Sequence, residues 1–155
     1  MDYQYQLYDA FSGMSPMEKS QVIRFLTEQE GHSECDSIRE AIEYAMKLKP
    51  SFGGFVLVAR HNKQIIGAII ANRTGMEAYN PKNIFVFVTV EASYRRQEAF
   101  VKQLIDQGVK YADGDIAMHV KSDNPALAIY QKLGFKAQYL ELRLPNPKSS
   151  PAVAS

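Results

Sequence analysis

The sequence of 155 residues holds a single cysteine, Cys35, which excludes a disulfide bond within the chain. Net charge is also nearly absent, because 18 lysine and arginine residues are balanced by 17 aspartate and glutamate residues. A balanced chain presents no field that favours nucleic acid or an anionic membrane as a partner. No apolar run approaches the roughly 20 residues that span a bilayer. The lone thiol and a polar N-terminus unlike a signal peptide favour a reducing, cytoplasmic setting.

Metal-ligand spacing is missing as well, since no pattern of histidine, cysteine and acidic residues fits a metal site. The chain length and an apolar content of 46% suit one soluble domain with a proper core. We expect this domain over residues 1–144. Residues 145–155 consist mainly of proline, serine, alanine and asparagine without periodicity, which predicts a disordered tail.

The N-terminal half predicts strands and helices that alternate with clear turn signals. Ser15-Pro16-Met17-Glu18 is a capping box with proline at the first helical position. A second capping box begins at Ser37, and Pro50 is expected to stop that helix. The predicted elements are a strand over 3–8, a helix over 15–29, a helix over 37–49, and a hairpin of strands over 54–60 and 65–72.

The C-terminal half is organised around residues 84–135, and no glycine lies between Gly75 and Gly108. A strand that runs into a turn and then a helix directs backbone N–H groups at an anion. The strand–helix–strand order predicts a right-handed crossover between parallel strands. The predicted elements are a strand over 84–90, a basic turn over 94–97, a helix over 98–112, a strand over 115–120, a helix from Asn124 and Pro125 to Gly134, and a last strand over 138–144.

Two motifs lie in this half. The first is Val88-Thr89-Val90 followed by Tyr94-Arg95-Arg96-Gln97, and the second is Asn124-Pro125-Ala126 followed by Tyr130 and Gly134-Phe135. Their order resembles the GNAT superfamily of acyl-CoA-dependent N-acetyltransferases, whose patterns are Arg/Gln-x-x-Gly-x-Gly/Ala and Asn-x-x-Ala-x-x-x-Tyr-x-x-x-Gly-Phe. The resemblance implies an α/β fold of the α+β type: a mixed central sheet with a splayed parallel pair and helices on both faces.

The resemblance also implies a binding site for acetyl-CoA. Two registers of the first motif are open. If Arg95 occupies the Arg/Gln position of the motif, Glu98 and Phe100 replace its glycines. If Arg96 occupies that position, Ala99 and Val101 replace them. We favour the second register because alanine differs little from glycine. In both registers the Glu98 carboxylate opposes the anion. The implied cofactor-binding residues are Val88, Thr89, Val90, Arg95, Arg96, Gln97, Glu98, Ala99, Phe100, Val101, Asn124 and Tyr130.

The implied reaction is direct transfer of acetyl from acetyl-CoA to a primary amine, without an acyl-enzyme. Tyr130 falls where the family's tyrosine meets the thioester sulfur, and a phenol of pKa about 10 can protonate a thiolate of pKa about 8.5. The amine must first lose a proton. Candidate bases are Glu30 and His32, which the resemblance places at the acceptor wall, followed by Glu34, Glu91 and His119.

Simpler interpretations remain for each of these residues. Tyr130 as a packed aromatic, His119 as a packed core histidine, and Glu30 and His32 as solvated loop residues all fit the pattern. The rival function is a degenerate family member that acts as a non-catalytic acyl-CoA-binding or interaction module, which the missing glycines favour. The amine acceptor stays unidentified, and the many apolar strand residues allow a homodimer.

Overall fold

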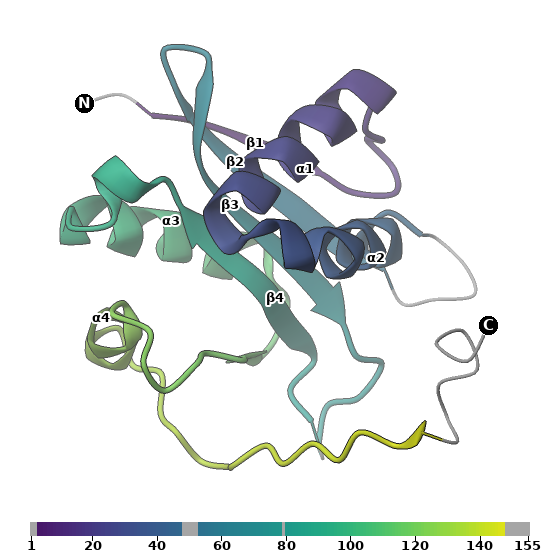
Figure 1. Cartoon of the computed structure of the whole chain (residues 1–155), viewed down its shortest axis with the longest axis vertical. Helices are drawn as coiled ribbons and strands as arrows, with labels where there is room; N and C mark the ends of the chain where they lie inside the picture. Colours follow the sequence, from purple (N-terminus) through teal and green to yellow (C-terminus); the bar gives the residue numbers. More distant parts are fainter. Residues whose placement is uncertain (1–2, 48–52, 79, 148–155) are drawn as a thin grey trace.

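The fold is a mixed sheet between two layers of helices, described by a computed structural model for residues 3–47, 53–78 and 80–147 (Figure 1). Five strands lie in the order β1-β2-β3-β4-β5. Neighbouring strands are antiparallel, except for the parallel pair of β4 and β5. The elements are β1 (Gln4–Tyr8), α1 (Pro16–Glu30), η1 (His32–Glu34), α2 (Cys35–Ala45), β2 (Gly54–His61), β3 (Gln64–Arg73), β4 (Asn83–Val90), η2 (Ala92–Tyr94), α3 (Glu98–Tyr111), β5 (Ile116–Met118) and α4 (Leu127–Lys132).

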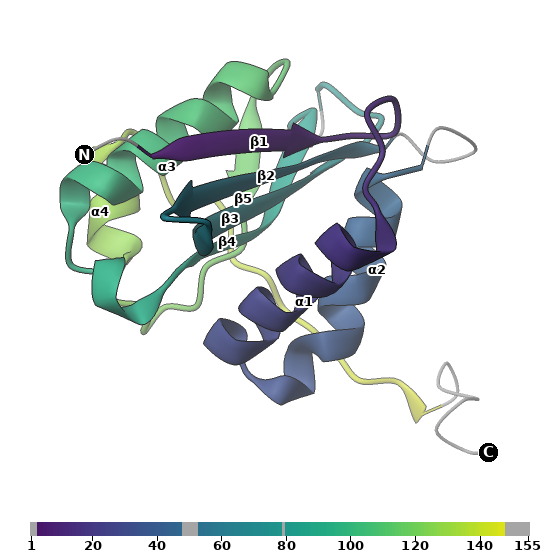
Figure 2. The ribbon, with the colours of Figure 1, turned by 90° about the horizontal axis from the view of Figure 1, so that it is seen from above.

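Two hydrophobic cores lie on opposite faces of this sheet. Figure 2 shows α1 and α2 on one side and α3 and α4 on the other. Leu26 and Ile42 pack on the first face against β2 and β3, and Leu104 packs on the second. The predicted fold class, a mixed sheet with helices on both faces, is confirmed. Within the described ranges, no helix is both long and apolar enough to cross a membrane.

The predicted start of α1 is confirmed, whereas that of α2 is wrong. The Glu18 backbone N–H donates to Ser15 Oγ at 3.1 Å, and the Ser15 N–H donates to Glu18 Oε1 at 3.0 Å, which is a complete capping box. Helix α2 begins at Cys35 directly after η1, without a side-chain cap, so Ser37 lies inside the helix. It ends at Ala45. Residues 48–52, with the predicted stop at Pro50, lie outside the described ranges.

The β2–β3 hairpin is confirmed. Its turn residues Asn62 and Lys63 have φ values of 51° and 69°, as in the type I′ turn that matches strand twist. Gly67 marks a close approach of α3 to the sheet. A Cβ atom there would lie 3.1 Å from Leu104 Cδ2 and 3.1 Å from Phe100 Cζ. The missing side chain therefore lets α3 pack directly on β3.

The last predicted strand is wrong. Residues 138–144 form no strand, and the side chains of Leu140, Leu142 and Leu144 are 90–91% exposed. Alternation of apolar and polar residues indicates which side chains share a face, but a strand also needs a neighbour to complete its hydrogen bonds. Strand β5 is likewise shorter than predicted. Most of the predicted disordered tail, residues 148–155, lies outside the described ranges.

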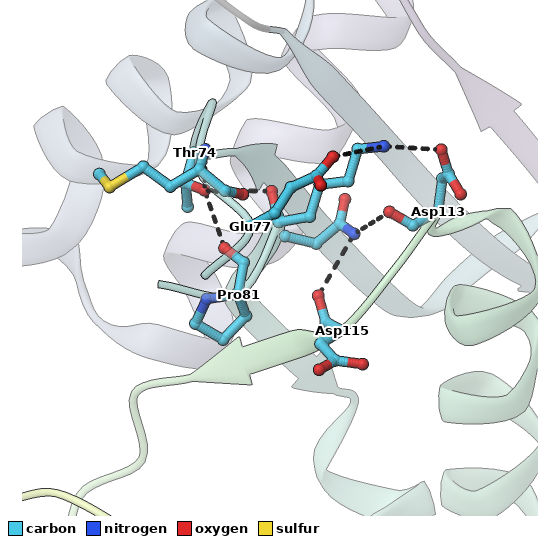
Figure 3. Close-up of polar contacts among 8 residues, drawn as sticks. Thr74, Glu77, Pro81, Asp113 and Asp115 are labelled. Carbon is cyan, nitrogen blue, oxygen red and sulfur yellow. Dashed lines mark hydrogen bonds and ion pairs between the residues drawn. The ribbon is translucent and has the colours of Figure 1, made fainter. Parts of the chain in front are cut away.

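Strands β4 and β5 are joined firmly at one end. Asn83 is 1% exposed, and its side-chain amide donates to the carbonyl oxygens of Asp113 at 2.9 Å and Asp115 at 3.4 Å. Its backbone N–H also donates to the Asp115 carbonyl, at 3.1 Å. Figure 3 shows these contacts beside the ion pair of Lys82 Nζ with Asp113 Oδ2, at 2.9 Å. The loop before β5 is thereby fixed to the start of β4.

Replacing Asn83 tests this junction. We expect Asn83→Ala to lower the free energy of unfolding by about 1–3 kcal/mol, because the variant loses the two hydrogen bonds by which the buried amide holds the loop before β5. Urea denaturation measures the change. Lys82→Met is the matched control, and we expect a smaller loss because that ion pair is exposed. Equal losses for the two variants would contradict a special role of the buried amide.

Candidate functional site

The central feature of the site is the divergence of β4 from β5. The two strands pair only at Asn83 with Ile116, Ile84 with Ala117, and Phe85 with Met118. Beyond Phe85, β4 continues to Val90 while it pairs only with β3. The parallel pair is therefore closed at one end and open at the other, and one edge of β4 lies free along the opening.

The backbone of Val88 and Val90 points into this opening. The Glu91 N–H donates to the Ile66 carbonyl at 2.8 Å, which places Glu91 in a hydrogen-bonded pair with β3. Hydrogen-bonded and non-hydrogen-bonded pairs alternate along an antiparallel ladder. The backbone N–H and C=O groups of Thr89 therefore also point toward β3, whereas those of Val88 and Val90 point away from it. The Val90 carbonyl accepts from Arg95 Nε at 3.0 Å. The N–H groups of Val88 and Val90 and the Val88 carbonyl thus lie where an extended ligand can pair with them.

The start of α3 presents further N–H groups at the same end. No side chain caps this 14-residue helix at Gln97. The amides of Phe100 and Val101 donate to the Gln97 carbonyl at 3.0 and 3.1 Å. Within the described ranges, the amides of Arg96 and Ala99 donate to no protein acceptor. Open amides and the helix dipole together favour an anion here.

The carboxylate of Glu98 is directed toward α4, where Glu98 Oε1 lies 3.6 Å from Lys132 Nζ. The cation offsets part of the negative charge at the start of α3. Phe100 and Val101 are each 2% exposed, so both registers of the motif place a core residue at the second glycine position. The Phe100 ring packs 4.8 Å from that of Tyr3. Core packing explains why a large side chain occupies this position.

Arg95 and Arg96 differ in their contacts. The guanidinium of Arg95 donates to the Val90 carbonyl and, from one terminal nitrogen, to Gln29 Oε1 at 3.0 Å. It thereby ties the turn after β4 to α1. Arg96 is exposed and forms no ion pair or side-chain hydrogen bond with the described residues. Its side chain is the freer of the two to meet a phosphate.

Helix α4 holds Tyr130 through its C-terminal turn. The Phe135 N–H donates to the Tyr130 carbonyl and the Gly134 N–H to the Gln131 carbonyl, each at 3.1 Å, which is a Schellman motif. Gly134 has a φ of 110°, a conformation that favours glycine. The Phe135 ring lies 6.3 Å from that of Tyr130. The Tyr-x-x-x-Gly-Phe spacing therefore fixes the position of the tyrosine.

The other end of α4 departs from the prediction. The helix begins at Leu127 rather than at Pro125. Asn124 Oδ1 accepts from the Ala126 N–H at 2.8 Å, which closes a turn before the helix. Asn124 thus orders the entry into α4 through its side chain.

Tyr130 and Glu30 approach the opening from opposite layers. Tyr130 is 4% exposed, and burial, followed by the negative charge of Glu30, raises the pKa of its phenol to about 12. Glu30 Oε2 accepts from the buried Thr89 hydroxyl at 2.5 Å, which fixes the carboxylate to β4. The phenol therefore remains a proton donor across the physiological pH range, with a carboxylate near it.

The remaining base candidates lie in other surroundings. The His32 side chain is exposed in η1 and forms no hydrogen bond or ion pair with the described residues, while its backbone carbonyl accepts from the Cys35 N–H. Glu91 caps η2, because its carboxylate accepts from the Ser93 N–H at 3.1 Å and from the Ser93 hydroxyl. The His119 side chain is 59% exposed, and its Nε2 lies 3.2 Å from Glu141 Oε2. The interpretation of His119 as a packed core histidine is wrong.

Sequence reasoning missed three contacts of the site, although it had named Thr89 as a cofactor-binding residue. The role of Thr89 in holding Glu30, of Gln29 in holding Arg95, and of Lys132 in meeting Glu98 depends on contacts between distant parts of the chain. Of the residues that make these contacts, only Lys132 could be linked to the site from the sequence, because it lies in the same motif as Tyr130. Among the residues that the structure describes, no group of three or more histidine, cysteine or acidic side chains is arranged to hold a metal ion.

A pocket of about 580 Å³ adjoins the turn after β4. The end of α1, the β2–β3 turn and the start of η2 line it. Two carboxylates, those of Glu28 and Glu91, are among its lining groups, together with His61 and Gln29. An acidic lining of this kind suits a cationic ligand.

The comparison with models of protein families shows the family of the chain. The model of the acetyltransferase (GNAT) domain matches residues 52–137, which is more than half of the chain. The protein belongs to the GNAT acetyltransferase family. The comparison with curated proteins gave no match.

Solved GNAT structures share the whole fold. A GNAT family acetyltransferase from Streptococcus pneumoniae TIGR4 has a TM-score of 0.66 at 13% identity, over 94% of this chain and 99% of that one. AAC(6')-Iy, in complex with a bisubstrate analogue, has a TM-score of 0.69 at 13% identity over the same shares. Ribosomal-protein-alanine N-acetyltransferase from Brucella melitensis has a TM-score of 0.63 at 11% identity, over 94% and 100%. At such identities the likeness concerns the fold alone.

The raised pKa of Tyr130 predicts how this GNAT protein responds to alkali. The folded state holds the phenolic proton more tightly than the unfolded chain, so its contribution to stability is complete below pH 10 and is lost as the pH rises through about 12. The chain has nine tyrosines, and we expect Tyr130→Phe to remove one phenol that ionises at a higher pH than an ordinary tyrosine. Tyrosinate absorbance of the folded wild type minus the variant measures it. A difference that titrates at the ordinary pKa of about 10 would contradict the buried environment.

Proposed function

We propose that the protein transfers acetyl from acetyl-CoA to a primary amine by direct attack, without an acyl-enzyme. The family supports acyl transfer in general. The observation that carries the specific proposal is the buried, protonated phenol of Tyr130 near the open edge of β4, with Glu30 of α1 bound to Thr89 of the same strand. A proton donor and a proton acceptor thus approach one opening from opposite layers of the fold.

The residues present fit acetyl-CoA. The free backbone groups of Val88 and Val90 suit the amides of its pantetheine arm. The open amides of Arg96 and Ala99, with the Arg96 side chain, suit its pyrophosphate. Glu98 is the group that opposes the fit, and Lys132 offsets its charge. When bound, acetyl-CoA supplies the acetyl group and a thiolate leaving group.

We assign one role to each polar group around the reacting atoms. Tyr130 donates its hydroxyl hydrogen bond to the departing sulfur and so stabilises the developing thiolate. The thiol, with a pKa of about 8.5, is a stronger acid than the phenol, so transfer of this proton is uphill and is completed when the phenolate regains a proton from solvent. A backbone N–H of Val88 or Val90 stabilises the oxyanion. Glu30 accepts the proton of the amine through Oε1, while Thr89 holds Oε2. His32, in the turn that follows, is the second candidate base.

The acceptor we propose is a basic amine. The carboxylates of Glu28 and Glu91 line the adjoining pocket, where a second cationic group of the acceptor can bind. Two structural neighbours have names that point to amine acceptors, a ribosomal-protein-alanine N-acetyltransferase and an enzyme bound to a CoA-acetylneamine analogue. The single free thiol, Cys35, supports a cytoplasmic site of action.

A second candidate function is a non-catalytic acyl-CoA-binding or interaction module. The observation that favours it is the glycine-free start of α3, where Glu98 and the buried Phe100 and Val101 stand instead. Glycines allow a phosphate to approach the backbone without meeting a Cβ atom. Weak binding without turnover would support this alternative.

Calorimetric titration with acetyl-CoA and with CoA is the first test. We expect micromolar binding by the wild type. Arg96→Glu should weaken it at least tenfold, which corresponds to about 1.4 kcal/mol, because it puts a negative charge beside the pyrophosphate. Glu98→Gln should tighten it, because it removes an opposing charge and releases Lys132.

The control for this titration is Arg39→Glu, the same charge reversal at an exposed position of α2. It should leave the affinity unchanged at moderate salt, where distant charges are screened. An absence of binding by the wild type up to millimolar ligand would overturn the enzyme proposal. Equal weakening by both reversals would contradict a phosphate site at Arg96.

Turnover tests the two catalytic side chains. The assay follows release of the CoA thiol with spermidine, neamine and an alanyl peptide as acceptors. We expect Tyr130→Phe and Glu30→Gln each to lower kcat by about 10²–10⁴-fold, because each removes a proton-transfer group, with a smaller effect on the affinity for acetyl-CoA. The matched controls Tyr111→Phe and Glu40→Gln should keep wild-type turnover. Full activity of Tyr130→Phe would contradict its role as the acid.

A further inference from the structure

Two adjacent contacts join the last turn of α1 to the end of β4. Glu30 Oε2 accepts from the Thr89 hydroxyl at 2.5 Å. The neighbouring residues are joined through a third residue, because Arg95 donates from Nε to the Val90 carbonyl and from Nη2 to Gln29 Oε1, at 3.0 Å each. One guanidinium therefore bridges a strand and a helix beside the carboxylate that we propose as the base.

The contact with Thr89 alone leaves the direction of the Glu30 carboxylate open. Glu30 is exposed, and α1 ends directly after it at Gly31, whose φ is 109°. A single hydrogen bond accepts a broad range of angles, so it does not fix the direction of a side chain at an exposed helix end. A second tie, one residue away on both elements, restricts the rotation of the whole last turn.

The contacts of Arg95 suit a bridge better than a phosphate site. Its guanidinium is a rigid, planar fork, and two of its donors are directed at oxygen atoms of different elements, one in the sheet and one in α1. A phosphate that recruited this group would break both hydrogen bonds. Arg96 can meet an anion without such a loss, since its side chain forms no hydrogen bond or ion pair with the described residues.

We propose that Arg95 and Gln29 are positioning residues: they hold the last turn of α1 against β4 and thereby direct Glu30 Oε1 toward the amine of the acceptor. The inference rests on the proposed acetyl transfer, in which Glu30 takes the proton of that amine. In this assignment neither positioning residue touches the reacting atoms. A base must lie within hydrogen-bond reach of the proton it takes, so a displaced carboxylate slows the reaction while the binding of acetyl-CoA is kept.

Replacing Gln29 by leucine tests the bridge, because the two side chains are similar in size and leucine offers no acceptor to Arg95. With spermidine, neamine and the alanyl peptide as acceptors, we expect Gln29→Leu to lower kcat about 10–100-fold and to change the affinity for acetyl-CoA by less than about threefold. Gln21→Leu, the same change at an exposed position of α1, is the control and should keep both values. Gln29→Glu keeps an oxygen for Arg95 and should recover most of the turnover.

A double variant shows whether the bridge acts through Glu30. Glu30→Gln keeps an oxygen for Thr89 but cannot take the proton of the amine. In that background Gln29→Leu should cause no further loss of kcat, because positioning has no effect once the base is removed. A loss of the same size in both backgrounds would overturn the positioning role, and so would a wild-type kcat in Gln29→Leu.

Hydrogen exchange gives a reading that needs no turnover. The amides of residues 27–31 should exchange faster in Gln29→Leu and in Arg95→Leu than in the wild type and in Gln21→Leu, because the end of α1 loses a tie to β4. Unchanged exchange in the first two variants would overturn the bridge.

Calorimetry with Arg95→Leu addresses the other role that Arg95 could have. We expect its affinity for acetyl-CoA to stay within about threefold of the wild type at moderate salt. A loss as large as that expected for Arg96→Glu would show that Arg95 binds the phosphate and would overturn the proposal. An inactive wild type would contradict the proposed function and the role of Glu30 with it, whereas an active wild type with an unchanged Gln29→Leu would contradict the positioning role alone.

Discussion

The early end of the parallel pairing between β4 and β5 is the constraint on which the rest of the structure depends. Three residue pairs and the buried amide of Asn83 hold the two strands at one end. The free edge of β4, the open amides at the start of α3, and the phenol of Tyr130 all lie around the resulting gap. A sheet that stayed paired to Val90 would use up the backbone groups that a ligand needs.

The features that sequence predicted best were set by local geometry. The capping box at Ser15, the turn at Asn62 and the glycine at Gly134 depend on neighbouring residues, and the structure has all three. Ser37 failed as a cap because η1 already led the chain into the helix. The contact of Glu30 with Thr89 joins residues far apart in the sequence, so no local pattern reveals it.

The start of α3 shows why the family motif is altered without loss of the helix. Phe100 and Val101 face the core, where Phe100 packs against Tyr3 and against the sheet near Gly67. Glycines at these positions would leave a cavity beside β3. The chain thus has packed core side chains where the family motif has glycines, and in our proposal the open amides and Arg96 recognise the phosphate.

The ion pair between Glu98 and Lys132 joins the two ends of the proposed reaction site. Lys132 lies on the same short helix as Tyr130, and the Schellman turn fixes the end of that helix. An anion at the start of α3 would compete with Glu98 for this exposed cation and so alter one contact between α3 and α4. If the proposed phosphate site is correct, donor binding at the start of α3 and the position of the helix that carries Tyr130 therefore share one side-chain contact.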